Sequence, residues 1–167
     1  MVSWGRYAGQ AALYALFAAA IGYCSTSPQY RPLEQGQALL RLSFKHAGKL
    51  VAECRKRSPE ELARLPANMR AELDCPRERS PVRVRVELDG GLLHDRTFPP
   101  AGLSRDGAAT GYWKLPLAAG THLIKVQVSD DVRAEGYTYE REARVEIRPG
   151  QAVLIDISEQ KGGVQIR

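Results

Sequence analysis

Apolar and polar residues alternate along most of the chain after residue 37, and this period of two predicts β-strands. The cleanest run is VRVRVEL at residues 82–88, where valines would face a core and charged side chains would face water. Asp89-Gly90-Gly91 follows it and is typical of a hairpin turn. Comparable alternation occurs at residues 39–44, 123–128, 137–147 and 153–157.

These patterns predict a mainly β fold for residues 37–167, an antiparallel β-sandwich of about seven to nine short strands. A parallel α/β sheet is disfavoured because segments long enough for crossover helices are missing. The segment KLVAEC (49–54) is expected to form a second strand, and residues 99–111 a loop. YWKLPL (112–117) predicts a short strand, and Pro116 places it at an edge or a strand end.

The first 25 residues have a different pattern, with Arg6 as the only charged side chain. Ala8 to Cys24 is apolar or small apart from Gln10, which as a helix spans about 25 Å, near the minimum for crossing a bilayer. We therefore expect residues 1–25 to be a membrane anchor or signal segment. Pro28 and Pro32 then predict a linker over residues 26–36.

Three readings of this N-terminal segment stay open. It is a retained single-span anchor, a signal peptide cleaved after the small residues Ala18–Ala20, or a lipoprotein signal ending at Cys24. The third departs from the usual pattern at Tyr23, where a small residue is expected. Each reading places the body outside the cytoplasm, and the first gives a single-pass protein of a bacterial inner membrane with its body in the periplasm.

A charged helical insert, residues 55–80, lies between two predicted strands, and Cys54 and Cys75 bracket most of it. In an oxidising compartment this pair predicts a disulfide, worth about 3 kcal/mol for a loop of about twenty residues. Free thiols and a metal or redox role are the alternatives. Ser58-Pro59-Glu60-Glu61 predicts a capped helix start, and Pro66 ends that helix.

The segments LPLAAGTHLIKVQV and VEIRPGQAVLIDI, between Leu115 and Ile157, pair glycine turns with alternating strands. This cadence resembles transthyretin-like, PEGA-like and related immunoglobulin-type extracytoplasmic β-sandwich modules. The resemblance implies a small binding or structural sandwich and no particular ligand. The Cys…Trp…Cys spacing of true immunoglobulin domains is absent.

The net charge of +5 does not indicate a class of partner, because the basic residues are interleaved with acidic ones. The sequence has no sustained basic stripe of the kind that indicates nucleic-acid binding. The candidate partner-binding residues are a basic collar around the insert and an aromatic pair: Arg55, Lys56, Arg57, Arg77, Arg79, Tyr112 and Trp113. We predict no catalytic, cofactor or metal site, since His46, His94 and His122 are scattered without ligand spacing.

These observations favour a non-enzymatic, membrane-tethered periplasmic interaction protein, an accessory or assembly subunit of a larger membrane complex, with respiratory complexes as one setting. The first alternative is a module that binds glycan or peptidoglycan through Tyr112 and Trp113. The second is a periplasmic protein that handles a metal or redox equivalents through its histidines or cysteines. Recovery of a partner from solubilised membranes separates the first hypothesis from the other two.

Overall fold

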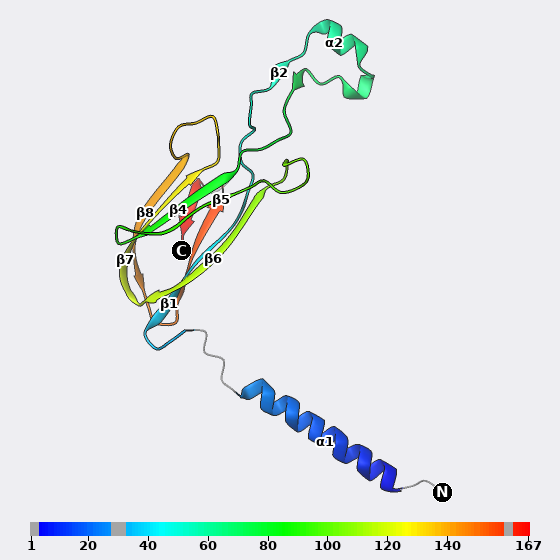
Figure 1. The fold of residues 1–167 in the computed structure, drawn as a ribbon, viewed down its shortest axis with the longest axis vertical. Helices are drawn as coiled ribbons and strands as arrows, with labels where there is room; N and C mark the ends of the chain where they lie inside the picture. Colours follow the sequence, from blue (N-terminus) through cyan, green and yellow to red (C-terminus); the bar gives the residue numbers. More distant parts are fainter. Residues whose placement is uncertain (1–3, 28–32, 159–161) are drawn as a thin grey trace. The chain divides into compact units, whose positions relative to one another are not determined.

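The computed structural model describes residues 4–27, 33–158 and 162–167, which form two compact units, Met1–Glu34 and Gln35–Arg167 (Figure 1). In the first unit, α1 (Trp4–Thr26) contains the whole apolar run predicted from Ala8 to Cys24 and buries none of its residues. By length and composition this helix is able to cross a membrane. Part of the predicted linker, residues 28–32 with both of its prolines, lies outside the described residues.

The second unit is a β-sandwich of two four-stranded sheets. In spatial order, the first sheet is β10 (Gly163–Ile166), β9 (Ala152–Ser158), β1 (Gln37–His46) and β6 (Ala109–Ala118). The second sheet is β5 (Gly91–Phe98), β4 (Val82–Leu88), β7 (Gly120–Ser129) and β8 (Tyr139–Ile147). All pairings within these sheets are antiparallel except β1 with β9, which run parallel. The predicted mainly β sandwich is confirmed.

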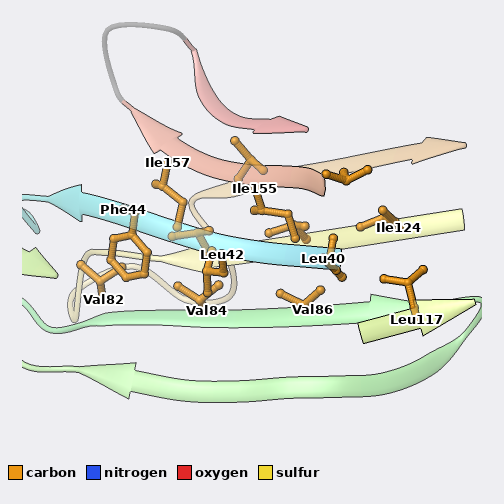
Figure 2. Close-up of a cluster of buried hydrophobic side chains, with 14 of the residues drawn as sticks. Leu40, Leu42, Phe44, Val82, Val84, Val86, Leu117, Ile124, Ile155 and Ile157 are labelled. Atoms are coloured by element: carbon orange, nitrogen blue, oxygen red, sulfur yellow. The ribbon is translucent and has the colours of Figure 1, made fainter. Parts of the chain in front are cut away.

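The core fills the space between the two sheets with one face of each strand, as the period of two predicts (Figure 2). Leu40 and Leu42 of β1 face Val84 and Val86 of β4, and all four side chains are inaccessible to solvent. Gly111 of β6 lies against the ring of Phe44, where a β-carbon would collide with it. The sheets are therefore held together by tightly packed aliphatic side chains.

A two-residue turn joins β4 to β5, because Asp89 and Gly90 have φ values of 51° and 82°. Positive φ at both central positions is the type I′ geometry that matches the twist of a hairpin. The expected turn at Asp89-Gly90-Gly91 is thus confirmed, with Gly91 already in the ladder opposite Leu88.

Two predicted strands differ from the structure. Residues 49–54 form no strand, and only an isolated bridge from Leu50 to Arg79 remains. Strand β6 is longer than expected, since it begins at Ala109 inside the predicted loop and continues through Pro116. Proline is tolerated there because β6 is an edge strand with a hydrogen-bonded neighbour on one side only.

Between β1 and β4 the chain leaves the sandwich to form the predicted insert (Figure 1). Its elements are β2 (Arg55–Lys56), α2 (Pro59–Arg64), the short 3₁₀ helix η1 (Ala67–Met69) and β3 (Leu73–Asp74). The chain leaves the sandwich after β1 and re-enters it at β4, so the insert lies at the end of the sandwich opposite the one where the chain enters β1.

Candidate functional site: the disulfide-closed insert

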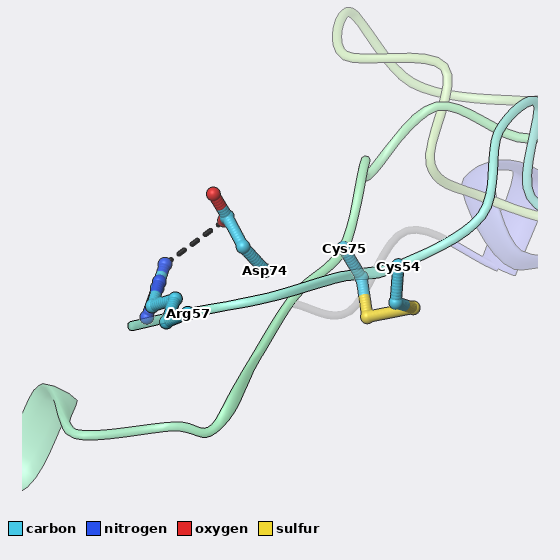
Figure 3. The surroundings of a disulfide bond; sticks show 4 residues. All are labelled: Cys54, Arg57, Asp74 and Cys75. Carbon is cyan, nitrogen blue, oxygen red and sulfur yellow. Dashed lines mark hydrogen bonds and ion pairs between the residues drawn. A yellow bond between two sulfur atoms is a disulfide. The ribbon is translucent and has the colours of Figure 1, made fainter. Parts of the chain in front are cut away.

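The insert is closed by the disulfide predicted between Cys54 and Cys75, whose Cα atoms lie 4.1 Å apart (Figure 3). Immediately beyond it, β2 and β3 pair through Arg55 opposite Asp74 and Lys56 opposite Leu73. The ladder continues with the Arg57 amide, which donates to the Glu72 carbonyl at 2.9 Å. The disulfide and this short ladder together fix the neck of the insert.

Beyond the neck, α2 begins with the capping box that the sequence predicts at Ser58. The Glu61 amide donates to Ser58 Oγ at 3.2 Å, and the Ser58 amide donates to Glu61 Oε2 at 2.9 Å. Pro59 occupies the first turn, and the helix ends at Arg64, just before Pro66. A helix of two turns at most is therefore stabilised from its N-terminus.

Ion pairs connect the helix to the neck. Arg55 lies 3.0 Å from Glu61 and 3.2 Å from Asp74, and Arg57 lies 2.9 Å from the other oxygen of Asp74 (Figure 3). The hydrogen bond from Arg55, with that from the Ser58 amide, lowers the pKa of Glu61. These exposed pairs are individually weak, but they share Asp74 and orient α2 on the ladder.

The base of the insert is hydrogen-bonded to the sandwich. The Lys49 amide donates to the Asp130 carbonyl at 2.8 Å, and the Ser80 amide donates to the Lys49 carbonyl at 2.7 Å. Gly48 approaches this contact so closely that a β-carbon would collide with the Ser80 carbonyl oxygen. The guanidinium of Arg79 donates to the Gly48 carbonyl at 3.0 Å, so both strands of the base are held to each other.

A buried pair lies directly below this base, where His46 Nε2 is 2.7 Å from Asp130 Oδ2. Their side chains are 4% and 0% exposed. His46 ends β1 and Asp130 follows β7, so the pair links the two sheets beside the base of the insert, where the Asp130 carbonyl also accepts from Lys49. Burial alone would raise the pKa of Asp130, but the hydrogen bonds from His46 and Thr138 outweigh it and lower that pKa.

The structure brings the predicted basic collar together but neutralises most of it. Arg55 and Arg57 pair as described, and Arg77 lies 2.9 Å from Asp106. Arg79 is half-buried and donates to backbone carbonyls, including that of Asp106 at 3.0 Å. Among the described residues of the collar, only the side chain of Lys56 has no ion-pair or hydrogen-bond partner, so the collar is not a strong anion site.

The predicted aromatic pair does not form one surface. Tyr112 and Trp113 are consecutive on β6, so their side chains point to opposite faces of the sheet. Trp113 packs against the core and has its ring 4.9 Å from that of His94. Tyr112 is 59% exposed on the outer face. A sugar-stacking platform made of both rings is therefore not present on either face.

Exposed apolar side chains at the insert were not anticipated from the sequence. Met69 is 60% exposed and Leu73 is 54% exposed. Two loops at the same end add Leu103, which is fully exposed, and Val132, which is 56% exposed. The backbone of Val132 donates to Ser80 Oγ at 3.2 Å, so its loop is attached to the insert base. The end of the sandwich that carries the insert therefore exposes apolar side chains, although the sequence of the insert is mainly charged.

The histidines have separate environments, and the described residues contain no group of three or more His, Cys, Asp and Glu placed to hold a metal ion. His122 contacts Asp89 at 2.7 Å and the Ala118 carbonyl at 2.9 Å, and the contact with Asp89 raises the pKa of His122. His94 is buried between Phe98 and Trp113, and its Nε2 has no hydrogen-bond partner among the described residues. Burial and the charge of Arg96 lower the pKa of His94.

The lowered pKa of His94 predicts a loss of stability in acid. The unfolded chain binds the proton more readily than the fold does, so stability falls as pH drops below about 6.5, the ordinary histidine value. In His94→Phe this contribution is absent. Thermal melting of both proteins from about pH 7.5 to 5 should show the wild type losing more melting temperature than the variant. His94→Leu serves as a second, smaller replacement, and parallel curves for all three proteins would contradict the assignment.

The chain matches no protein-family model, no curated protein and no solved structure. The resemblance to transthyretin-like, PEGA-like and immunoglobulin-type modules therefore stays a prediction. The geometry of the insert and of the sandwich end that carries it is what any functional hypothesis has to rest on.

Proposed function

We propose that this chain is a non-enzymatic interaction protein, tethered to a membrane by α1, with its body on the extracytoplasmic side. In a bacterium this body lies in the periplasm. The insert docks on a protein partner, which makes the chain an accessory or assembly subunit of a larger membrane complex. Two features support the setting: an apolar helix long enough to cross a bilayer, and a disulfide of the kind that persists in oxidising compartments.

The observation that carries the docking role is the exposure of Met69 and Leu73 on an element that is closed covalently. The disulfide and the β2–β3 ladder hold Leu73 in a fixed position, so its burial by a partner costs little ordering entropy. Apolar anchors of this kind, surrounded by polar residues, are typical of the centre of protein interfaces. Because Arg55 and Arg57 are already paired with acids of the insert, we expect apolar contact to dominate the affinity.

The test is capture of the tagged full chain from gently solubilised membranes, followed by identification of co-purifying protein. Leu73→Ser and Met69→Ser are expected to weaken binding of a specific partner about thirtyfold or more, the effect of losing an interface hot spot, and to reduce its recovery accordingly. Leu92→Ser is the matched control, because Leu92 is 56% exposed and lies at the β4–β5 hairpin, on the other end of the sandwich.

Equal loss of the partner in the Leu92 control would contradict docking through the insert. Recovery of the wild type only as a free chain would contradict the accessory-subunit role itself. Both variants alter exposed side chains, and their melting temperatures should stay close to that of the wild type.

A further inference from the structure

The outer face of the sheet β10-β9-β1-β6 carries cations that no described residue of the chain neutralises. Arg41 and Lys45 of β1 point outward, since their neighbours Leu40, Leu42 and Phe44 fill the core. On β6, Lys114 is also exposed, and it lies directly opposite Arg41 in the ladder. Like charges placed opposite each other in a sheet are mutually repulsive.

Within the described part of the chain, none of these three cations has an ion-pair or hydrogen-bond partner. The strands β9 and β10 bring one carboxylate among their described residues, Asp156, and it lies 3.1 Å from Arg167. No described residue of the sandwich therefore relieves the repulsion between Arg41 and Lys114. We name the surface formed by Arg41, Lys45 and Lys114 the cationic face.

The other sheet shows that this arrangement is not general for the protein. On its outer face Arg83 lies 2.7 Å from Asp95, and Lys125 lies 3.1 Å from Glu140. Arg85 likewise contacts Glu87. That outer face therefore pairs three of its strand cations with acids, and the fourth, Arg144 of β8, has Glu142 and Glu146 two residues away on the same side of the strand. By contrast, no described acid pairs with Arg41, Lys45 or Lys114, which leaves these cations available for an anion outside the chain.

Three features indicate which anion this is. The cationic face is formed by pleated strands and thus suits an extended surface. Tyr112, 59% exposed, stands opposite Ser43 on the same face, and tyrosine is enriched where apolar and charged layers of a membrane meet. Finally, β1 is the first strand after α1, and the segment 27–36 between them spans at most about 35 Å. A membrane entered by α1 is therefore always within reach of the body.

We propose that the cationic face binds the anionic phospholipid headgroups of the membrane in which α1 is anchored. This inference rests on the membrane tether of the proposed function. Because the tether keeps the face close to the lipid, weak contacts suffice, and each basic residue near an anionic surface raises the bound population about fivefold. The attraction is electrostatic, so salt should weaken it.

The experiment places one fluorophore on each sheet of the full chain, in a Cys24→Ser background that keeps the disulfide. Thr110→Cys puts the label on the cationic face, opposite Lys45, and Thr97→Cys puts it on the outer face of the other sheet, opposite Arg83. Both threonines are exposed. The protein is reconstituted into vesicles of phosphatidylcholine alone, or of equal parts phosphatidylcholine and phosphatidylglycerol, each with nitroxide-headgroup lipid as quencher.

We expect quenching at position 110 to rise when phosphatidylglycerol is present, to fall with added salt, and to exceed quenching at position 97. Replacing Arg41, Lys45 and Lys114 by glutamine should remove this excess, a change of about a hundredfold in bound population. The triple variant should melt no lower than the wild type, because it removes the repulsion between Arg41 and Lys114. Equal quenching at both positions, or quenching independent of lipid charge, would overturn the proposal.

Flotation of the vesicles separates this inference from the proposed function. A chain that does not float with lipid overturns the tether, and this inference with it. A chain that floats, but shows no excess quenching at position 110, overturns the cationic face alone. If the triple variant loses a captured protein while lipid charge has no effect, the face binds an acidic protein surface, and the lipid assignment is wrong.

Discussion

Asp130→Ala is expected to lower the free energy of unfolding by about 3 kcal/mol, the range in which removal of one partner of a buried pair falls. The variant leaves His46 at 4% exposure without the carboxylate that lies 2.7 Å from it. The variant keeps the backbone carbonyl of residue 130, which accepts from the Lys49 amide at the base of the insert, so the loss reports on the side-chain pair. Urea denaturation at neutral pH, followed by tryptophan fluorescence, measures this loss.

Asp130→Asn is the matched control, because the amide keeps the volume and offers an oxygen to His46. We expect it to lose less stability than the alanine variant. Combining Asp130→Ala with His46→Ala in a double-mutant cycle should give a coupling energy above about 0.5 kcal/mol, since the two side chains are in direct contact. Additive losses, or a loss in Asp130→Ala of well under about 1 kcal/mol, would show that the pair does not hold the sheets together.

The same pair sets a pH dependence with a definite sign. Because the pKa of Asp130 is lower in the fold than in the unfolded chain, its contribution is present above the ordinary aspartate value of about 3.9. The contribution is lost as pH falls through the pKa of the folded state. The difference in the free energy of unfolding between the wild type and Asp130→Ala should therefore narrow in acid. Other carboxylates of the fold are protonated equally in both proteins, so they do not change this difference.

The sequence predicts those parts of the fold that depend on neighbouring residues. Strand β4 follows from the alternation of its valines with charged residues, and its hairpin follows from Asp89 and Gly90. The start of α2 follows from Ser58 and Glu61, which satisfy each other within a single turn. In each case the interaction spans a few residues, so its participants can be recognised side by side in the sequence.

Features that depend on distant residues could not be predicted in this way. Residues 49–54 have a strand-like composition, yet the Val51 amide donates to Glu78 and the Lys49 amide to Asp130, so no continuous ladder forms. The parallel pairing of β1 with β9 likewise joins strands that are far apart in the sequence of the domain. The partner of Arg77 is Asp106, on a loop that the sequence gives no reason to place beside the insert.

The candidate site shows the same division. The disulfide was predictable from Cys54 and Cys75 together with the N-terminal segment, because a disulfide requires only an oxidising compartment and an even number of thiols in the body. The exposure of Leu73 was not predictable, because a leucine between Glu72 and Asp74 reads equally well as a buried anchor of the insert. Only the β2–β3 ladder, which turns that side chain outward, decides between the two.

Replacing both Cys54 and Cys75 by alanine is expected to lower the free energy of unfolding by about 3 kcal/mol, the loop-entropy value for a crosslink of this span. The two cysteines are 21 residues apart in the sequence. Without the disulfide, the neck is closed by the β2–β3 ladder of two residue pairs. A ladder this short is marginal in water, so the insert should open locally before the sandwich unfolds. Hydrogen exchange should then detect early loss of protection at the Arg57 amide, while the amides of β4 stay protected.

The loss of order has a functional consequence that separates it from general destabilisation. Without the disulfide, Leu73 has no fixed position, and we expect the double-alanine variant to lose the proposed partner as expected for Leu73→Ser, although the leucine itself is still present. Cys24→Ser is the control for thiol removal, since Cys24 lies on α1 and forms no disulfide. If the variant kept both the protection of the Arg57 amide and the partner, the neck would be stable through the β2–β3 ladder and the shared Asp74 ion pairs alone, and the covalent closure would be dispensable for docking.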